Sequence, residues 1–385
     1  MREHNERVLL QAIRLHGSLP KAELARLSKL STQTVSVIVD RLLVDGLVER
    51  QAALRGKLGQ PSRPIALRPD AVYALGIRLG RRSLDLLLLD FAGQPRWRAS
   101  VAYAVPQVEQ VFDEIGRQLE RARTFLGEDG ASRLCGIGMA APLSFDGWQD
   151  LLGMDPADAA DWAQVDMRAR LQAMTSLPVE FAKDTAAACV AELVTGAGRT
   201  LENYLYIYVD VLAGGGLVID SQPHGGRHGN AGAVGSMPLG LSARGQASQL
   251  LEEASLLTLE RMLAEAGLPA LEPGDERMLQ APWAGAVRDW LVRAADAIAF
   301  AVCSGTSLLD LDGVILDGAF GRDLLRALLE EVEAALARYD WQGAARPRIV
   351  AGQVGADAKV VGAAFLPLHS GFAPAHDLFL KAARR

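Results

Sequence analysis

Cysteine is scarce in this chain of 385 residues, and long apolar runs are missing. The three cysteines, Cys135, Cys189 and Cys303, lie far apart and form no C-x-x-C pair, which excludes a disulfide framework and a cysteine-based zinc cluster. The longest aliphatic run, Leu86–Leu89, is far shorter than the ~20 residues that cross a bilayer. The opening MREHNERVLL has charges where a signal peptide needs an apolar core. We therefore expect a cytoplasmic protein with no membrane partner.

Positive charge is also scarce overall, but it is unevenly distributed. The formal net charge is −6, with 50% hydrophobic and 22% charged residues, a composition typical of globular domains. Residues 1–70 contain twelve Lys and Arg against seven Asp and Glu, so this segment carries +5 and the remaining chain −11. A basic head on an acidic body is typical of a protein in which one small domain binds a polyanion, although a solvated helical surface can also be modestly basic. The length predicts two to three domains.

The basic head has the pattern of a helix-turn-helix. Apolar residues recur at helical spacing in residues 5–15, and Lys21–Leu27 forms a second short helix after Pro20. Ser31 is placed to cap a third helix, Thr32–Val44, which we interpret as the recognition helix. Its polar side chains that point away from the core are the candidate DNA contacts, namely Thr32, Gln33, Thr34, Ser36 and Arg41.

A candidate wing follows this helix. Leu47–Gln51 and Pro64–Leu67 form a predicted hairpin around the basic tip RGKLGQPSR. A flexible basic tip can lie against phosphates or enter a minor groove, and the candidate contacts there are Arg55, Lys57 and Arg63. The head therefore predicts a double-stranded DNA partner. The alternative is a small helical bundle that merely forms its own core.

From Tyr73 onward, strands alternate with helices, which predicts an α/β body. AVYALGIRLG and SLDLLLLDFAG open it as paired strands, and YLYIYVDVLAGGGLVID repeats that opening later, so we expect two similar lobes. We assign residues 1–70 to a winged helix-turn-helix, 71–182 to the first lobe and 183–367 to the second lobe with a helical oligomerisation region. We expect residues 368–385 to return to the first lobe.

Several motifs in the correct order resemble the ROK family of repressors, open reading frames and kinases, in its regulator branch. They are KAELARLSKLSTQTVSVIVDRLLVDGLVER and GQPSRP in the head, and GIGMAAPL, PVEFAKDTAAACVAEL, GGGLVIDSQPHGGRHGNAGAVGSMPL and VGADAKVVGAAF in the body. The resemblance implies a winged helix-turn-helix joined to an actin-like, sugar-kinase-like (ribonuclease H-like) two-lobed domain. It also implies a homodimer or tetramer that binds DNA.

The departures from the family pattern fall on its phosphate turns. Kinases of the family carry an Asp-x-Gly-Gly-Thr turn after the first strand, but here Arg78, Arg81 and Arg82 replace its Asp, second Gly and Thr. The second turn, Gly-Thr-Gly in the family, reads Asp210-Val211-Leu212. Asp317 replaces a glycine of the adenosine turn. We therefore expect no nucleotide cofactor and no enzyme activity. The three arginines either form a solvated turn paired with nearby acids or bind a phosphorylated or acidic effector.

The zinc and sugar positions are altered as well. Ser236 stands where the family has a zinc-binding His, no Cys lies between Cys189 and Cys303, and we expect no metal. Asp184 matches the family's catalytic base, which accepts a proton from a sugar hydroxyl. It either contacts a ligand or caps the helix that follows. The candidate effector-binding residues that the resemblance implies are Lys183, Asp184, His228, Asn230, Ser236 and Glu252.

These observations favour a sequence-specific transcriptional regulator, a repressor of carbohydrate-related genes whose degenerate kinase-like domain senses a sugar, a sugar phosphate or another sugar derivative. One alternative is a sugar kinase that carries a DNA-binding head. The other is a ligand-independent regulator that a protein partner controls.

Overall fold

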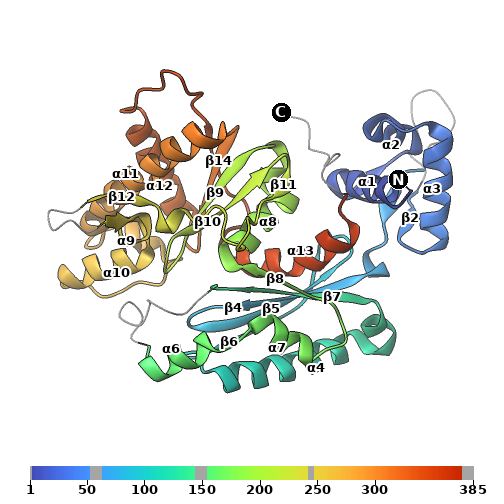
Figure 1. Cartoon of the computed structure of the whole chain (residues 1–385), viewed down its shortest axis with the longest axis horizontal. Coiled ribbons are helices and arrows are strands. Elements are labelled where there is room, and N and C mark those ends of the chain that lie inside the picture. Colours follow the sequence, from blue (N-terminus) through green and yellow to red (C-terminus); the bar gives the residue numbers. More distant parts are fainter. Residues whose placement is uncertain (1, 53–62, 144–153, 242–246, 375–385) are drawn as a thin grey trace. The chain divides into compact units, whose positions relative to one another are not determined.

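A computed structural model of the chain describes residues 2–52, 63–143, 154–241 and 247–374 (Figure 1). Contacts between residues divide the chain into two units. Unit 1 comprises Met1–Ala187 together with Val360–Arg385, and unit 2 comprises Ala188–Lys359. Each unit is described by itself.

The N-terminal part of unit 1 is a winged helix. Three helices pack with a small antiparallel sheet of strand order β1-β3-β2. The elements are α1 (Arg2–His16), β1 (Ser18–Leu19), α2 (Lys21–Ser28), α3 (Thr32–Val44), β2 (Val48–Arg50) and β3 (Ile65–Leu67). The predicted helices and hairpin are confirmed, whereas β1 was not predicted, because two residues are too short for an alternating pattern to appear.

Local chemistry explains the helix boundaries of this domain. Gly17 ends α1 with φ 78°, and Lys29 ends α2 in the left-handed region with φ 56°. The Ser31 hydroxyl accepts a hydrogen bond from the Thr34 backbone N–H at 3.1 Å, which confirms Ser31 as the cap of α3. Val35, Ile38, Val39 and Leu42 of α3 are buried, and Leu43 is half-buried.

The rest of unit 1 is a mixed five-stranded sheet of order β6-β5-β4-β7-β8. The first three strands along the chain pair antiparallel, and β7 and β8 add in parallel. The strands are β4 (Tyr73–Leu79), β5 (Ser83–Asp90), β6 (Pro95–Ala102), β7 (Leu134–Ala141) and β8 (Val179–Lys183). The helices α4 (Val108–Ser132), α6 (Pro156–Ala163) and α7 (Met167–Ala173) lie on one face of the sheet (Figure 1). Helix α4 continues past a non-helical Gly127 to Ser132.

The opposite face of this sheet is covered by α13 (Ala358–Phe372). Two glycines allow the helix backbone to lie against the strands: a Cβ on Gly138 would be 1.8 Å from the Ala363 carbonyl oxygen, and one on Gly76 would be 2.4 Å from the Ala364 nitrogen. At its far end Phe372 packs edge-on against Phe91, with ring centroids 4.9 Å apart. This end of α13 therefore lies beside the first turn that follows β5.

The winged helix also contacts this region within unit 1. The Arg14 guanidinium of α1 lies over the Phe91 ring, 5.1 Å from its centroid, and Arg7 Nη1 donates to the Ala373 carbonyl at 3.5 Å. Burial lowers the pKa of Arg14 to about 10, and burial together with the Arg14 charge lowers the pKa of His369 on α13 to about 4. Helix α1 and the end of α13 thus share one apolar, cation-containing junction.

Unit 2 repeats the sheet topology of unit 1. Its order is β11-β10-β9-β14-β15, again an antiparallel opening followed by two parallel strands. The strands are β9 (Tyr204–Val209), β10 (Gly214–Ile219), β11 (Gln222–Pro223), β14 (Gly313–Gly318) and β15 (Arg348–Ala351), and a separate ladder joins β12 (Pro238–Leu241) and β13 (Ala247–Gln249). The matching order confirms two similar lobes and the mixed α/β class.

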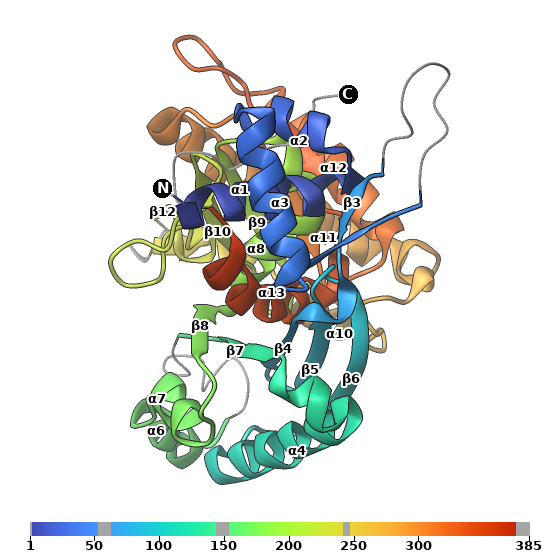
Figure 2. The same ribbon diagram turned by 90° about the vertical axis from the view of Figure 1, so that its right-hand side faces the viewer.

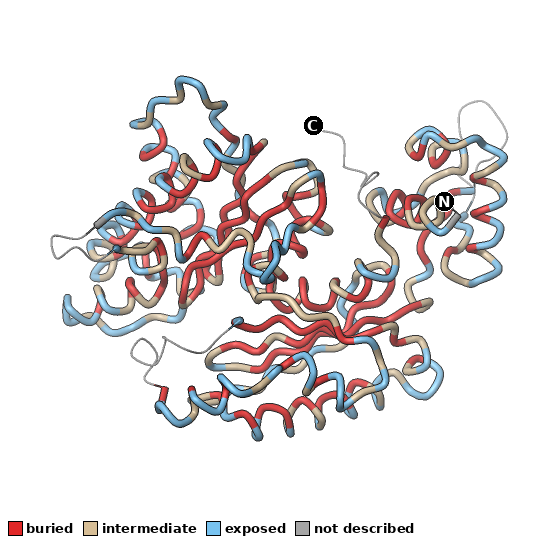
Figure 3. Tube along the Cα trace, viewed as in Figure 1, coloured by how far each residue is buried: buried red, intermediate tan, exposed pale blue. Residues whose placement is uncertain are grey.

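Helices supply much of the unit 2 core. They are α8 (Asp184–Thr195), which begins in unit 1, and α9 (Leu250–Ala254), α10 (Leu256–Glu265), α11 (Ala284–Leu309) and α12 (Arg322–Leu336). Among the described residues, α11 is the one helix long and apolar enough to cross a membrane by length and composition. Its buried side chains, including Val287, Trp290 and Ile298, belong to the core of unit 2. Figure 3 marks the buried stretches of the chain in red.

Candidate functional sites

Helix α3 (Figure 2) has one solvent-exposed side, which carries polar residues together with Val37 and Val44. Thr32, Gln33 and Arg41 are exposed, and Thr34 and Ser36 are half-buried. The Thr34 hydroxyl is 2.8 Å from the Ser31 hydroxyl, and Ser36 Oγ accepts from Lys21 Nζ at 2.9 Å. The fold therefore keeps the predicted recognition residues of α3 out of its buried side, and it engages Thr34 and Ser36 within the domain.

Arg41 has partners of its own. Its guanidinium is 3.0 Å from the Glu6 carboxylate of α1 and 3.6 Å from Asp45. Of the predicted wing contacts, Arg63 is exposed, while Arg55 and Lys57 lie outside the described residues.

A charged cluster that was not predicted from the sequence lies beside the recognition face. Lys21 Nζ and Arg50 Nη2 both approach Asp40 Oδ1, at 2.9 Å and 3.3 Å. The spacing of Asp40 from Gln33, seven residues along the helix, could have placed this carboxylate on the same face, since i and i+7 lie on one side of an α-helix.

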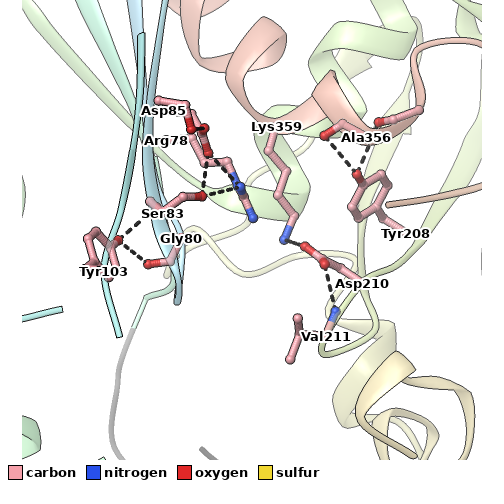
Figure 4. Close-up of polar contacts among 12 residues, drawn as sticks. Arg78, Gly80, Ser83, Asp85, Tyr103, Tyr208, Asp210, Val211, Ala356 and Lys359 are labelled. Atoms are coloured by element: carbon pink, nitrogen blue, oxygen red, sulfur yellow. Dashed lines mark hydrogen bonds and ion pairs between the residues drawn. The ribbon is translucent and has the colours of Figure 1, made fainter. Parts of the chain in front are cut away.

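The altered first phosphate turn of unit 1 is held by internal bonds (Figure 4). Arg78 Nη1 lies 2.8 Å from Asp85 Oδ2, which also accepts from Ser83 Oγ at 2.9 Å. The other oxygen, Asp85 Oδ1, accepts from Ser100 Oγ at 2.6 Å. Arg78 therefore pairs with a nearby acid, one of the two alternatives for this turn, and its charge is compensated inside the sheet.

The second phosphate turn, in unit 2, contains a buried ion pair (Figure 4). Lys359 Nζ is 2.8 Å from Asp210 Oδ2, and the two side chains are 6% and 10% exposed. The ammonium also lies 5.3 Å from the centre of the Tyr208 ring. We expected the negative charge of Asp210 to repel a nucleotide; the structure instead shows that charge neutralised by Lys359.

Backbone donors of the same turn are already used. The Val211 N–H donates to Asp210 Oδ1 at 2.7 Å, and the Ala213 N–H donates to the buried Ser255 hydroxyl at 2.8 Å. A phosphate cradle works by offering such N–H groups to the ligand. Here the chain's own oxygens accept them.

The adenosine-turn position is likewise filled from within unit 2. Asp317 is fully buried; its Oδ2 accepts from the Gly355 N–H at 2.7 Å and its Oδ1 pairs with Arg322 at 3.1 Å. Buried Glu192 accepts from the N–H groups of Gln353 and Val354 at 2.6 and 2.7 Å. Burial raises the pKa of Glu192, and the nearby Asp317 charge adds to that shift.

The predicted effector residues fall in both units. In unit 1, Lys183 ends β8 and Asp184 begins α8; both are half-buried, and Asp184 Oδ1 accepts from the Thr185 N–H at 2.8 Å. In unit 2, His228 and Asn230 lie in an exposed glycine-rich loop that the Ala231 N–H closes by bonding to the Gly225 carbonyl at 3.0 Å. Asp184 therefore makes a helix-start contact at the first residue of α8.

Ser236 and Glu252 are exposed on neighbouring elements of unit 2. Ser236 ends the short helix η3 (Val234–Ser236), and Glu252 lies in α9. The Leu250 N–H bonds to the Met237 carbonyl at 3.0 Å and joins the two elements. Among the described residues, no group of three or more His, Cys, Asp or Glu is placed to hold a metal ion.

Comparison with known proteins places these features in a family. The ROK family model matches residues 74–369, and the MarR family model matches residues 5–57. A putative xylose repressor of Caldicellulosiruptor sp. is 25% identical over 278 residues, which cover 70% of this chain and 68% of that protein.

Solved structures agree in fold. A ROK family transcriptional regulator, a homologue of the E. coli MLC protein, has a TM-score of 0.70 at 20% identity and covers 95% of this chain and 96% of its own. A ROK family glucokinase from Streptomyces griseus, in complex with glucose and AMPPNP, has a TM-score of 0.60 at 22% identity and covers 76% of this chain and 98% of its own. The chain belongs to the ROK family and carries a MarR-type helix-turn-helix segment ahead of its ROK region.

Proposed function

We propose that this protein is a sequence-specific, DNA-binding transcriptional regulator, a cytoplasmic repressor whose ROK body senses a sugar or a sugar derivative without phosphorylating it. The proposal is carried by one observation, the combination of a DNA-binding type of domain with an altered kinase-like body. A winged helix with an exposed polar recognition face is joined to a sugar-kinase-like body whose phosphate turns are filled by the chain's own side chains. The relative named as a putative xylose repressor supports the carbohydrate link.

The DNA-binding part follows from the geometry of α3. A helix with short polar side chains at its N-terminus can enter the major groove, where a Gln side chain pairs with an adenine edge. Two copies in a homodimer would place their recognition helices about one DNA turn apart, on a roughly palindromic operator.

Replacing Gln33 by Ala tests this part. Gln33 is exposed, so we expect a folded protein that loses discrimination at one base pair, by about 1–3 kcal/mol or roughly 5- to 150-fold in relative affinity. The operator is first obtained by selecting duplexes from a random pool with the full-length wild type. Fluorescence anisotropy then compares the selected duplex with single-base variants. An unchanged base profile in Gln33→Ala would show that α3 does not read the groove through this residue.

The lack of kinase activity rests on the second phosphate turn. A nucleotide would have to displace the Lys359–Asp210 pair and compete with the acceptors of two N–H groups. Titration calorimetry with MgATP should therefore show no binding. Micromolar binding, or phosphorylation of a hexose, would favour the sugar-kinase alternative instead.

Substitutions of Asp184 test whether the ROK body senses a sugar, because they separate a contact with the ligand from the capping of α8. Asp184→Asn keeps an oxygen that can accept from the Thr185 N–H but removes the charge, whereas Asp184→Ala removes both. We expect both variants to bind operator DNA like the wild type in the absence of ligand and to lose at least tenfold in sensitivity to the sugar that releases the wild type. The sugar is found by screening pentoses and hexoses for release of the wild type from the operator.

The opposite pattern would assign Asp184 to helix capping alone. In that case Asp184→Asn would respond like the wild type and Asp184→Ala would lose stability rather than sensitivity. Control by a ligand also requires that the ligand bind one arrangement of the body more tightly than the other.

A further inference from the structure

The recognition face of α3 contains a carboxylate, which is an unusual neighbour for DNA phosphates. Gln33, Ser36, Val37, Asp40 and Val44 share one side of the helix, because they recur every three or four residues. Val37 and Val44 are 67% and 86% exposed, which places this side in solvent. If α3 enters the major groove, the negative charge of Asp40 enters with it and opposes the phosphate backbone.

Two cations from different elements converge on that carboxylate. Lys21, the first residue of α2, and Arg50, the last residue of β2, both point to Asp40 Oδ1, at 2.9 Å and 3.3 Å. Lys21 also donates to Ser36 Oγ at 2.9 Å. The hydrogen bond from Lys21 lowers the pKa of Asp40, so the carboxylate stays ionised at neutral pH.

The cluster is a surface feature rather than a part of the core. The side chains of Lys21, Asp40 and Arg50 are 34%, 55% and 53% exposed. Ion pairs this exposed add little to stability, so the cluster is better explained by a role at the surface where it lies. Lys21 begins the helix that precedes the recognition helix in the chain, and Arg50 ends β2, so the two cations come from different elements to the same carboxylate.

We infer that Asp40 is a specificity-determining positioning residue, which holds Lys21 and Arg50 in fixed places beside the recognition helix and keeps them from binding phosphates indiscriminately. On random DNA, contact with either cation requires breaking its bond to Asp40, and the carboxylate repels the backbone. On the correct site, base contacts seat α3 deeply enough for both cations to reach phosphates in one register. This inference rests on the proposed DNA-binding function.

The test is Asp40→Asn in the full-length protein, assayed on the selected operator duplex and on a random duplex of equal length. We expect binding to random DNA to strengthen about three- to tenfold at low salt. On the random duplex, the slope of log Kd against log salt concentration should be steeper than that of the wild type by about one unit, because at least one more cation contacts a phosphate. Operator affinity should change less, so the ratio of operator to random affinity falls by roughly tenfold or less.

The matched control is Glu23→Gln, which makes the same change in net charge within the same domain. Glu23 pairs with Arg26 at 2.8 Å on the surface of α2 and does not contact the cluster. We expect it to leave the affinity ratio unchanged. In addition, Lys21→Gln should reduce the salt dependence on the operator duplex more than on the random duplex, and Lys21→Arg, which keeps the ion pair, should keep the wild-type ratio.

Three results would overturn the inference. The first is that Asp40→Asn matches Glu23→Gln on both duplexes, the second that it weakens binding to both duplexes equally, and the third that it changes the preferred base at a single position. The last result would mean that Asp40 reads a base directly. Failure of the wild type to enrich any sequence would instead overturn the proposed function, so the two failures are distinguishable.

Discussion

Replacing Lys359 by Met should destabilise unit 2 by about 3–5 kcal/mol, the usual consequence of removing one partner of a buried ion pair. The side chains of Lys359 and Asp210 are 6% and 10% exposed, so the substitution leaves a carboxylate with little access to water. Met has a similar length and can occupy the space of the lysine side chain without its charge. Urea unfolding, together with hydrogen exchange of the segments that contain β9 and β10, measures the loss.

The double variant Asp210→Asn with Lys359→Met is the critical control. It removes both charges and keeps an amide oxygen for the Val211 N–H, so we expect most of the lost stability to return. Arg277→Met breaks an ion pair of 2.6 Å whose arginine side chain is 61% exposed, and it should leave the unfolding midpoint unchanged. Additive effects of the two single substitutions at Asp210 and Lys359 would contradict a coupled pair.

Acidification should open the junction between α1 and α13. Burial beside Arg14 lowers the pKa of His369 to about 4 in the folded chain, against about 6.5 when unfolded. At a pH between these two pKa values, the unfolded chain binds more protons at His369 than the folded chain does. The contribution of His369 to stability is therefore complete above pH 6.5 and is lost as the pH falls toward 4. A shift of this size corresponds to about 3 kcal/mol.

Hydrogen exchange of α13 from pH 7 to pH 4 checks this prediction against His369→Gln, which cannot titrate in that range. We expect the difference between the opening free energies of the two proteins to change by about 3 kcal/mol across the range. Other carboxyl groups titrate in both proteins and cancel in the difference. Parallel curves for the two proteins would show that His369 does not carry this pH dependence.

The winged helix was predictable from sequence because its signals are local. Ser31 caps α3 through a residue three positions away, Gly17 ends α1, and the apolar spacing of Val35, Ile38 and Leu42 marks the buried side. The repeated hairpin openings of the body also lie in continuous segments. The strand order of each sheet follows from these hairpins and from the crossover connections that add the parallel strands.

At the phosphate turns, the sequence predicted the substituted residues but not the partners that they bind. The substitutions at Arg78 and Asp210 are visible in the sequence and indicate that a nucleotide is disfavoured. Their partners are not visible in the same way: Asp85 lies on the adjacent strand, and Lys359 is 149 residues from Asp210. Nothing in the local pattern around Lys359 distinguishes a buried lysine from a solvated one on an amphipathic helix.

The sequence by itself determined the element types, the winged helix and the loss of the kinase pattern, because helix caps, apolar periodicity and missing residues act over a few positions. The tertiary structure decided which charges are compensated. It placed Lys359 against Asp210, and Lys21 and Arg50 against Asp40, by packing helices on sheets and strands. The electrostatic energy of a pair depends on the distance between its charges and on their burial, and only the folded chain sets both.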